Sequence, residues 1–261
     1  MLAQREVKLN KDTNLLKLIA ITTMLIDHLG ARVFPGVEVM RVIGRLAFPI
    51  FAYCIAVGCV YTRNIGKYAL RMIIMAVLVQ PLYTLAMRDY KTIDFLFQNY
   101  KFGYGIFTYF YFEAGNVNIF FTLTMGILMI WSIKEKNVIA VVTVALSIYL
   151  IQTRLDYGWE GIAMMLLFYI FIEVPVAAIA SVGVLMIYMG SPSFFMRWNF
   201  QYYTPQIYAL AALPLICWRM NTGIKVPKYV FYAFYPAHML LIYLILTYNL
   251  FGLAPTLPPW Y

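Results

Sequence analysis

Long apolar segments separated by short polar ones run through most of this chain. A helix needs about 20 mostly apolar residues to cross the hydrocarbon core of a membrane, with a range of roughly 17 to 25. We therefore expect an all-α, polytopic integral membrane bundle that forms a single domain over residues 15–250. The pattern predicts about nine spans, or eight to ten if ambiguous breaks are counted differently: 15–34, 39–60, 68–87, 118–133, 137–152, 160–173, 175–190, 204–218 and 228–250.

Three segments and one break need separate interpretation. Residues 1–14 are polar and charged, and we expect them to lie in the cytoplasm. Residues 88–117 are rich in Tyr and Phe, which is typical of a re-entrant or interfacial segment at headgroup depth. Residues 251–261 form a short C-terminal tail. The sequence at 173–175 is compatible with a tight turn between two helices or with a kink in one long helix.

The composition indicates lipid as the solvent. Of 261 residues, 63% are hydrophobic and only 12% are charged, about half the charged fraction of a soluble domain. The net charge of +9 then reflects Lys and Arg in cytoplasmic loops and near anionic headgroups, so nucleic acid is not expected as a partner. The three cysteines lie in apolar runs without metal-ligand spacing, so no metal is expected either.

The distribution of basic residues predicts the orientation. With nine spans, twelve of the 20 Lys and Arg fall on the side of the N-terminus, which favours a cytoplasmic N-terminus. The loop "YTRNIGKYALR" carries Arg63, Lys67 and Arg71, and we expect these three to form a basic cytoplasmic mouth for a phosphorylated donor or lipid headgroups. Most acidic residues fall on the opposite, outward half, where a polar cavity is expected.

Two histidines lie inside predicted spans. A charged side chain at the centre of a span costs at least about 2.5–3.5 kcal/mol, so such groups face a cavity, pair with one another or take part in function. His28 and His238 are the only histidines of the chain and lie near the middle of the first and last spans. They are interpreted either as a shared polar site, with imidazole as the usual general base, or as two hydrogen-bonded structural residues.

Asp27 precedes His28, but neighbouring side chains on a helix point about 100° apart. We therefore expect Asp27 to pair with Arg41 or Arg45 of the second span, as a structural salt bridge or as part of a site. Their i,i+4 spacing places both guanidinium groups on one helix face, suited to phosphate or carboxylate. Pro49 is expected to bend that helix or open its hydrogen-bond ladder.

Two other polar positions stand at the starts of predicted helices. Asp156, in "DYGWEG", either caps the sixth span or contacts a substrate. Asn118 stands at the start of the fourth span, where its amide either caps the helix or contacts a substrate.

Six stretches together resemble the TraX family in order and spacing, from about Leu16 to Tyr243: "LKLIAITTMLIDHLG", "RVIGRLAFPIFAYCIAVG", "YTRNIGKYALR", "FFTLTMGIL", "DYGWEG" and "FYAFYPAH". The founding member of that family is associated with N-acetylation of conjugative pilin. The chain is also similar to the wider acyltransferase-three family, which has a functional His in its first span, an Arg-x-x-Arg pair and usually ten spans. Here the pair is Arg41-x-x-x-Arg45 and about nine spans are expected, so the correspondence is inexact.

The resemblance implies an acyltransferase of the bacterial cytoplasmic membrane. It would take an acetyl group from cytoplasmic acetyl-CoA, its co-substrate, and deliver it to a pilin, glycan or small-molecule acceptor on the other side. The expected catalytic residues are His28 as general base, His238 as its assistant, Arg45 as oxyanion donor and Asp27 as the anchor of the arginines. Acyl-CoA and the acceptor are expected to contact Arg41, Arg63, Lys67, Arg71, Asn118, Asp156 and Tyr235.

Two other function classes stay open. A proton-coupled transporter or flippase would use Asp27 and His28 as a proton site, although no internal repeat is visible in the sequence. A non-enzymatic factor for the assembly of a pilus or surface polymer would need neither side chain for chemistry.

Overall fold

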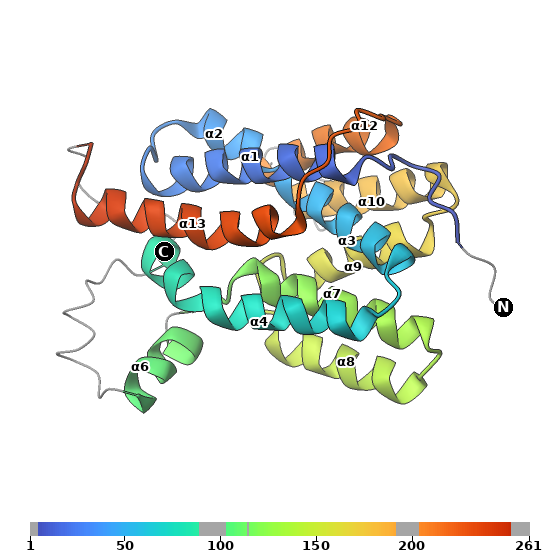
Figure 1. Ribbon diagram of the computed structural model, residues 1–261, viewed down its shortest axis with the longest axis horizontal. Helices are drawn as coiled ribbons and strands as arrows, with labels where there is room; N and C mark the ends of the chain where they lie inside the picture. The colour runs from blue at the N-terminus through green and yellow to red at the C-terminus, as the bar shows by residue number, and fades with distance from the viewer. Residues whose placement is uncertain (1–4, 89–102, 114, 192–203, 252–261) are drawn as a thin grey trace.

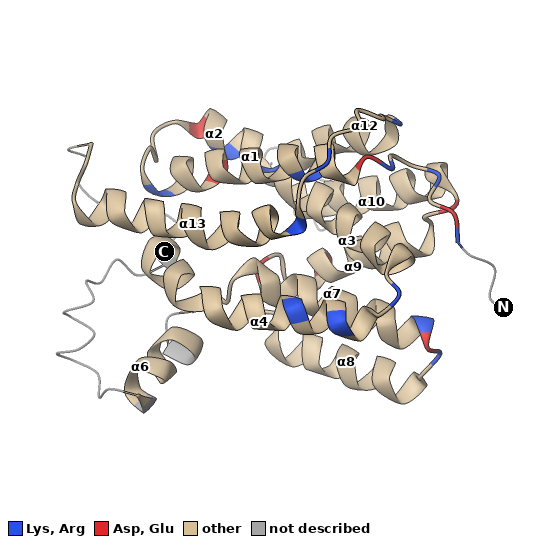
Figure 2. Ribbon diagram, in the orientation of Figure 1, with Lys and Arg blue, Asp and Glu red and all other residues tan. Residues whose placement is uncertain are grey.

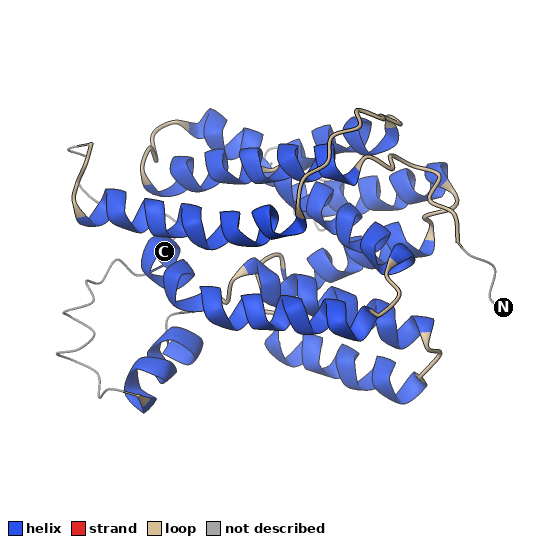
Figure 3. Ribbon diagram, viewed as in Figure 1, coloured by secondary structure: helices blue, strands red, loops and turns tan. Residues whose placement is uncertain are grey.

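The computed structural model describes residues 5–88, 103–113, 115–191 and 204–251, and within these ranges the chain is helical with no strand (Figures 1 and 3). The predicted all-α class is therefore confirmed. The helices are α1 (Thr13–Arg32), α2 (Glu38–Gly44), α3 (Ala47–Tyr61), α4 (Ile65–Tyr83), the π-helix η1 (Thr84–Arg88), α6 (Tyr104–Thr108), the π-helix η2 (Tyr109–Glu113), α7 (Ile119–Lys134), α8 (Val138–Ile151), α9 (Gly158–Ile170), α10 (Pro175–Gly190), the 3₁₀ helix η3 (Pro205–Ala211), α12 (Ala212–Cys217) and α13 (Lys228–Thr247).

Four helical stretches of the described chain are long and apolar enough to cross a membrane: Thr13–Arg32, Glu38–Tyr61, Ile65–Met87 and Lys228–Thr247. Five shorter apolar helices, of 10 to 17 residues, coincide with the other five predicted spans. Each is shorter than the roughly 20 residues of a typical membrane span. The structure thus supports a membrane protein with four full-length spans, and the count of nine stays a prediction.

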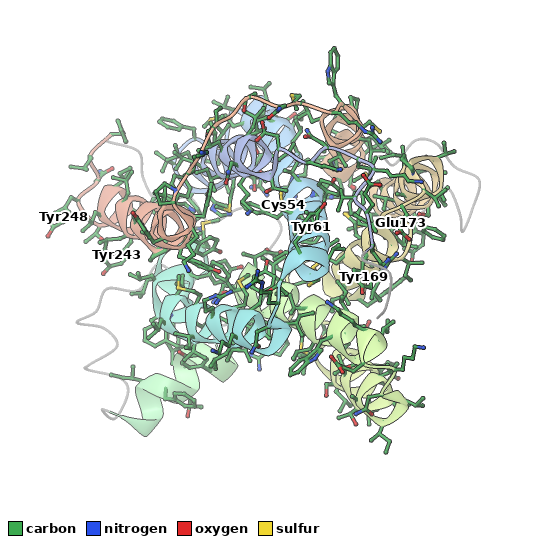
Figure 4. The ribbon with its side chains drawn as sticks, turned by 45° about the vertical axis from the view of Figure 1, so that its right-hand side comes forward. Cys54, Tyr61, Tyr169, Glu173, Tyr243 and Tyr248 are labelled. Carbon is green, nitrogen blue, oxygen red and sulfur yellow. The ribbon has the colours of Figure 1, made fainter. Side chains whose placement is uncertain are left out.

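Helix α3 lies in the middle of the bundle, where Cys54 and Tyr61 are labelled in Figure 4. It packs against α1, α7, α9 and α12, and nearly all of its side chains from Ala47 to Cys59 are buried. Helix α13 lies beside α1 and α4 (Figure 1). This arrangement brings the first and last long helices together next to the central one.

The second predicted span is broken between α2 and α3. Pro49 has no N–H with which to reach the carbonyl of Arg45. The N–H groups of Arg45 and Leu46 bond only three residues back, to Val42 and Ile43, at 3.2 and 3.3 Å. The predicted effect of Pro49 on the helix is therefore confirmed, and the break frees α2 to approach α1 at its own angle.

The aromatic segment near 88–117 is described only in part, because residues 89–102 lie outside the described ranges, as do residues 252–261 of the predicted tail. Its described part contains the short helices α6 and η2. Tyr111 of η2 donates a 2.6 Å hydrogen bond to the carbonyl of Val77, an acceptor that Pro81 leaves free because it has no N–H. The segment is thereby tied to α4.

The break at 173–175 is a turn between two helices and not a kink. Helix α9 ends at Ile170, and α10 begins at Pro175. Proline is well suited to this position because the first turn of a helix has no intrahelical partner for its N–H.

Basic side chains gather at the end of the bundle where α4 and α13 begin and α7 ends (Figure 2). The chain enters at this end too, since α1 starts beside it (Figure 1). This is the end that the distribution of Lys and Arg predicts to be cytoplasmic, and the sidedness stays a prediction.

The polar N-terminal segment is built into this end of the bundle. Val7, Leu9 and Asn10 are fully buried, and the backbone of Asn10 bonds to Ile216 at 3.0 Å and to the hydroxyl of Tyr53 at 2.6 Å. Hydrogen bonds from Thr222 hold the pKa of Asp12 below its usual range. Residues 5–12 therefore belong to the folded unit and do not form a separate polar segment.

We predict that Asn10→Ala destabilises the protein far more than Lys11→Ala. The Asn10 amide donates to the Leu215 carbonyl and accepts from the Asp12 N–H, and each buried group left unpaired costs about 1–3 kcal/mol. The Lys11–Glu6 pair is more than half exposed on both sides, and water and salt screen such surface pairs so that they contribute little to stability. Thermal unfolding in detergent tests this, and equal melting temperatures for the two variants would contradict it.

Candidate functional site

A cavity of about 240 Å³ lies between α1, α2, α3 and α13, and we call it the polar chamber. Helix α1 contributes Asp27 and His28, and α13 contributes Tyr235. The other polar residues of its wall come from the end of α1, from α2 and its C-terminus, from the end of α4 and from the turn before α9: Arg32, Arg41, Arg45, Tyr83, Asp156 and Tyr157. The structure thus brings together in one wall six of the residues that the sequence singled out, from Asp27 to Tyr235.

The two histidines are in direct contact. Nδ1 of His28 lies 2.9 Å from Nε2 of His238, and Nδ1 of His238 lies 2.9 Å from the carbonyl oxygen of Phe234. A carbonyl only accepts, so Nδ1 of His238 carries a hydrogen and its Nε2 in the neutral ring is an acceptor. Nδ1 of His28 must then donate, which leaves Nε2 of His28 unprotonated.

His28 makes no other hydrogen bond to the described residues, and its ring lines the polar chamber. His238 lies behind it and does not line the chamber. The pair therefore presents one basic nitrogen, Nε2 of His28, to the chamber, with His238 fixing the tautomer from behind.

Asp27 is held by both arginines, as the sequence predicted. Its carboxylate accepts from Arg41 at 2.8 Å and from Arg45 at 2.7 and 3.0 Å. The three side chains are mostly buried, with exposed fractions of 12% for Asp27, 24% for Arg41 and 15% for Arg45. Two guanidinium groups thus share one carboxylate, a ratio that leaves an excess positive charge beside the chamber.

The two arginines differ in how many donors they have left. Arg45 also donates from Nε to the Arg41 carbonyl and from Nη1 to Gln206, at 3.2 and 3.3 Å. The side-chain bonds of Arg41 to the described residues all start from Nη1. Arg41 therefore has more donors left for a ligand than Arg45. Gln206 is a partner that no sequence pattern pointed to.

Glycine at position 44 makes the ion pair possible. A Cβ built on Gly44 would overlap Cβ and Oδ1 of Asp27, and one built on Gly30 would lie 2.6 Å from Cβ of Met40. Helices α1 and α2 approach each other this closely because both positions lack a side chain.

The turn before α9 differs from what was expected. Asp156 was predicted to cap that helix or to contact a substrate. The N-cap position is Tyr157, without a side-chain hydrogen bond, and Asp156, one residue before it, lines the polar chamber. Tyr157 adopts φ +62° and stacks on Phe48 with ring centroids 3.9 Å apart. Positive φ is uncommon for an aromatic residue, so the position of Tyr157 in this wall could not be predicted from its residue type.

Asn118 has a structural position outside both cavities. Its side chain caps α7 by accepting from the Phe120 N–H at 3.0 Å. Its amide donates to the Ala76 carbonyl at 2.8 Å and to Gln80 at 2.9 Å. Since these bonds engage both ends of the amide, the expected contact of Asn118 with a substrate is replaced by a link between α4 and α7.

A second cavity of about 400 Å³, the apolar chamber, lies between α1, α3, α4, α7 and α13. Three cations line it, Lys17, Arg71 and Lys228, and within the described ranges none of them forms an ion pair. The predicted mouth is corrected in part, because Arg63 and Lys67 are exposed and line neither cavity. Lys67 precedes Arg71 by one turn of α4, about 6 Å along the helix axis, so its side chain lies outside the apolar chamber.

The two chambers adjoin. Four side chains line both of them: Met24, Phe51, Ile119 and Tyr235. A single layer of side chains therefore separates the basic nitrogen of His28 from the apolar chamber. Among the described residues, no group of three or more His, Cys, Asp or Glu side chains is placed to hold a metal ion.

Comparison with known proteins shows which sequences this chain is similar to. The sequence model described as TraX protein matches residues 12–246. The chain is 29% identical to an uncharacterised protein of Rickettsia prowazekii over 60% of its own length and 54% of that relative, so the match spans about half of the relative. It is 25% identical to the "Probable fimbrial assembly protein FimC, serogroup H1" of Dichelobacter nodosus over 87% of this chain and 92% of that protein. No solved structure matches.

We predict that Gly44→Ala lowers the melting temperature by several degrees, whereas Gly36→Ala leaves it nearly unchanged. The added methyl at 44 would push Asp27 away from its arginines, and overpacking of this kind costs about 1–3 kcal/mol. At Gly36 the same methyl meets nothing within 4 Å. Thermal unfolding in one detergent tests the pair, and equal shifts would show that the close approach of α1 and α2 does not support the fold.

Proposed function

This chain belongs to the TraX protein family, and from that premise we propose that it is a membrane acyltransferase. It takes an acetyl group from cytoplasmic acetyl-CoA and delivers it to an amine or hydroxyl acceptor on the other side of the bacterial cytoplasmic membrane. The observation that supports this best is the linked pair His28–His238, whose free Nε2 lines the polar chamber one side-chain layer away from the apolar one.

The apolar chamber is the proposed donor site. Acetyl-CoA carries phosphates, which Lys17, Arg71 and Lys228 would hold at the end of the bundle assigned to the cytoplasm. Lys17 and Arg71 stand over the rings of Phe231 and Tyr68, at 5.6 and 5.8 Å. Since these cations lack an acidic partner in the described chain, their charge is available to an anionic ligand. The uncharged pantetheine arm would then extend along the apolar wall toward Tyr235.

The transfer step uses His28 as general base. Nε2 of His28 takes the proton of the acceptor amine or hydroxyl as that atom attacks the thioester carbon. The tetrahedral intermediate then collapses, the carbon–sulfur bond breaks, and His28 returns the proton to the departing CoA sulfur. His238 accepts from Nδ1–H of His28 throughout, which stabilises the positive charge that forms on the His28 ring.

The oxyanion of the intermediate needs donors that are not already used. Arg45 was the expected donor, but its side chain is engaged by Asp27, Gln206 and the Arg41 carbonyl. We therefore assign this role to Arg41 and the hydroxyl of Tyr235, both in the chamber wall. One such donor contributes about 10²–10³-fold in rate.

The contacts of Asp27 and the named relatives bear on the two other function classes, the proton-coupled transporter and the non-enzymatic assembly factor. A proton carrier would use Asp27 as its proton site, yet both oxygens of that carboxylate already accept hydrogen bonds from the guanidinium groups of Arg41 and Arg45. A non-enzymatic assembly factor is the second candidate, and the name of the Dichelobacter relative favours it. An acyltransferase could also take part in fimbrial assembly if its acceptor is a subunit of the surface fibre.

We predict that His28→Ala lowers the release of thiol from acetyl-CoA by at least about 100-fold. His238→Gln keeps an oxygen that can accept from His28, so it should be at least about 10-fold more active than His238→Leu, which keeps none. Purified protein in liposomes, supplied with a panel of amines and alcohols, tests both. Full activity in His28→Ala would show that His28 is not the general base. If the parent protein releases no thiol, the non-enzymatic assembly factor is favoured instead.

A second prediction separates the cations that line the apolar chamber from those that do not. Arg71→Ala should raise the KM for acetyl-CoA about 10-fold and leave kcat nearly unchanged, because it removes a binding interaction. Lys67→Ala, one turn earlier on α4, should change neither by more than about twofold, since Lys67 lies outside the chamber. An equal rise of the KM in both variants would indicate that acetyl-CoA is attracted by the overall positive charge of this end and is not bound in the apolar chamber.

A further inference from the structure

We propose that the four side chains shared by the two chambers form a selectivity ring that limits the length of the acyl group transferred. The ring consists of Met24, Phe51, Ile119 and Tyr235, which come from α1, α3, α7 and α13. This inference rests on the proposed function and concerns the place at which that function distinguishes one donor from another.

The ring lies next to the histidine pair. Met24 precedes His28 by four residues, about one helical turn, and the ring centroid of Tyr235 lies 6.4 Å from that of His28. His28 lines only the polar chamber, whereas the cations Lys17, Arg71 and Lys228 line only the apolar one. The reacting carbon of a donor held by those cations must therefore reach the ring before an acceptor in the polar chamber can attack it.

One side of the ring is fixed by packing. Tyr235 is 3% exposed, and its ring stands edge-on to Phe120 at 4.9 Å and to His238 at 5.1 Å. Movement of Tyr235 would disturb both contacts, and close-packed interiors resist such shifts. Met24 and the half-buried Phe51 are the members whose truncation should enlarge the opening without disturbing the histidine pair.

The chemistry requires the acyl group, and not CoA, to cross this ring. When the carbon–sulfur bond breaks, the thiol stays with the donor in the apolar chamber, and the new carbon–nitrogen or carbon–oxygen bond lies on the acceptor side. The acyl chain must then fit the polar chamber, which is smaller, at about 240 against 400 Å³. Its wall also carries the charged groups of Asp27, Arg41 and Arg45, so a longer acyl chain has less room and lies partly against charged side chains. Short acyl groups are favoured at this point, whereas the donor chamber alone would accept longer ones.

The test compares Phe51→Ala and Met24→Ala with Ile55→Ala. Ile55 is buried and lines the apolar chamber but not the ring, so its truncation enlarges the proposed donor site and removes as many heavy atoms as Met24→Ala. Thiol release is measured with acetyl-, butyryl- and hexanoyl-CoA in the parent protein and each variant. Phe51→Ala and Met24→Ala should raise the ratio of kcat/KM for hexanoyl-CoA to that for acetyl-CoA by at least about 10-fold, the scale on which apolar pockets discriminate methylenes. Ile55→Ala should keep the parent ratio.

Several outcomes would overturn the proposal. Ring variants that are folded and active with the parent ratio would show that selection lies elsewhere, and an equal rise in Ile55→Ala would place it in the donor chamber. Phe51→Leu replaces Phe51→Ala if thermal unfolding shows that the alanine variant is not folded, and it should raise the ratio in the same direction. No thiol release by the parent protein with any donor would contradict the proposed function and, with it, this inference. An active parent protein with an unchanged ratio in both ring variants would contradict only the inference.

Discussion

The ion pair of Asp27 with Arg41 and Arg45 is the contact on which the arrangement of the site depends. Removing one partner of a buried pair costs about 3–5 kcal/mol, so α2 can lie in this bundle only where the carboxylate meets it, beside Gly44. Adjacent side chains on a helix diverge by about 100°. With Asp27 fixed toward α2, His28 is turned toward α13, where His238 meets it. The two neighbouring residues thus serve opposite sides of one helix.

The fixed direction of His28 also defines the two chambers. Asp27, Arg41 and Arg45 line the polar chamber, whereas the three cations without an acidic partner in the described chain line the apolar chamber. A basic nitrogen between an anion-binding site and a polar cavity suits the transfer of an uncharged group between molecules that do not themselves meet. This contrast supports the proposed group transfer more than ion transport, because the Asp27 carboxylate is held by two arginines whereas Nε2 of His28 has no hydrogen-bond partner among the described residues.

Several parts of this structure could be predicted from the sequence because they follow from the cost of polar groups in an apolar bundle. These include the helices, the partner of Asp27 and the meeting of His28 with His238. Other parts depend on which helix ends converge, and this is a tertiary property. Lys17 and Lys228 line the apolar chamber from two ends of the chain, while Arg63 and Lys67 do not. The burial of Asn10 and the positive φ of Tyr157 likewise had no local signal, whereas the cap by Asn118 was one of the two roles that its position at a helix start predicts.

The central claim is that His28 and His238 form one hydrogen-bonded pair with a free Nε2 on His28. Because the chain contains only two histidines, nitrogen NMR of the ¹⁵N-histidine-labelled protein in lipid, prepared without a histidine tag, observes these two rings alone. The account predicts two neutral rings protonated at Nδ1, with a coupling between Nδ1 of one and Nε2 of the other. Rings protonated at Nε2, or two uncoupled rings, would contradict it.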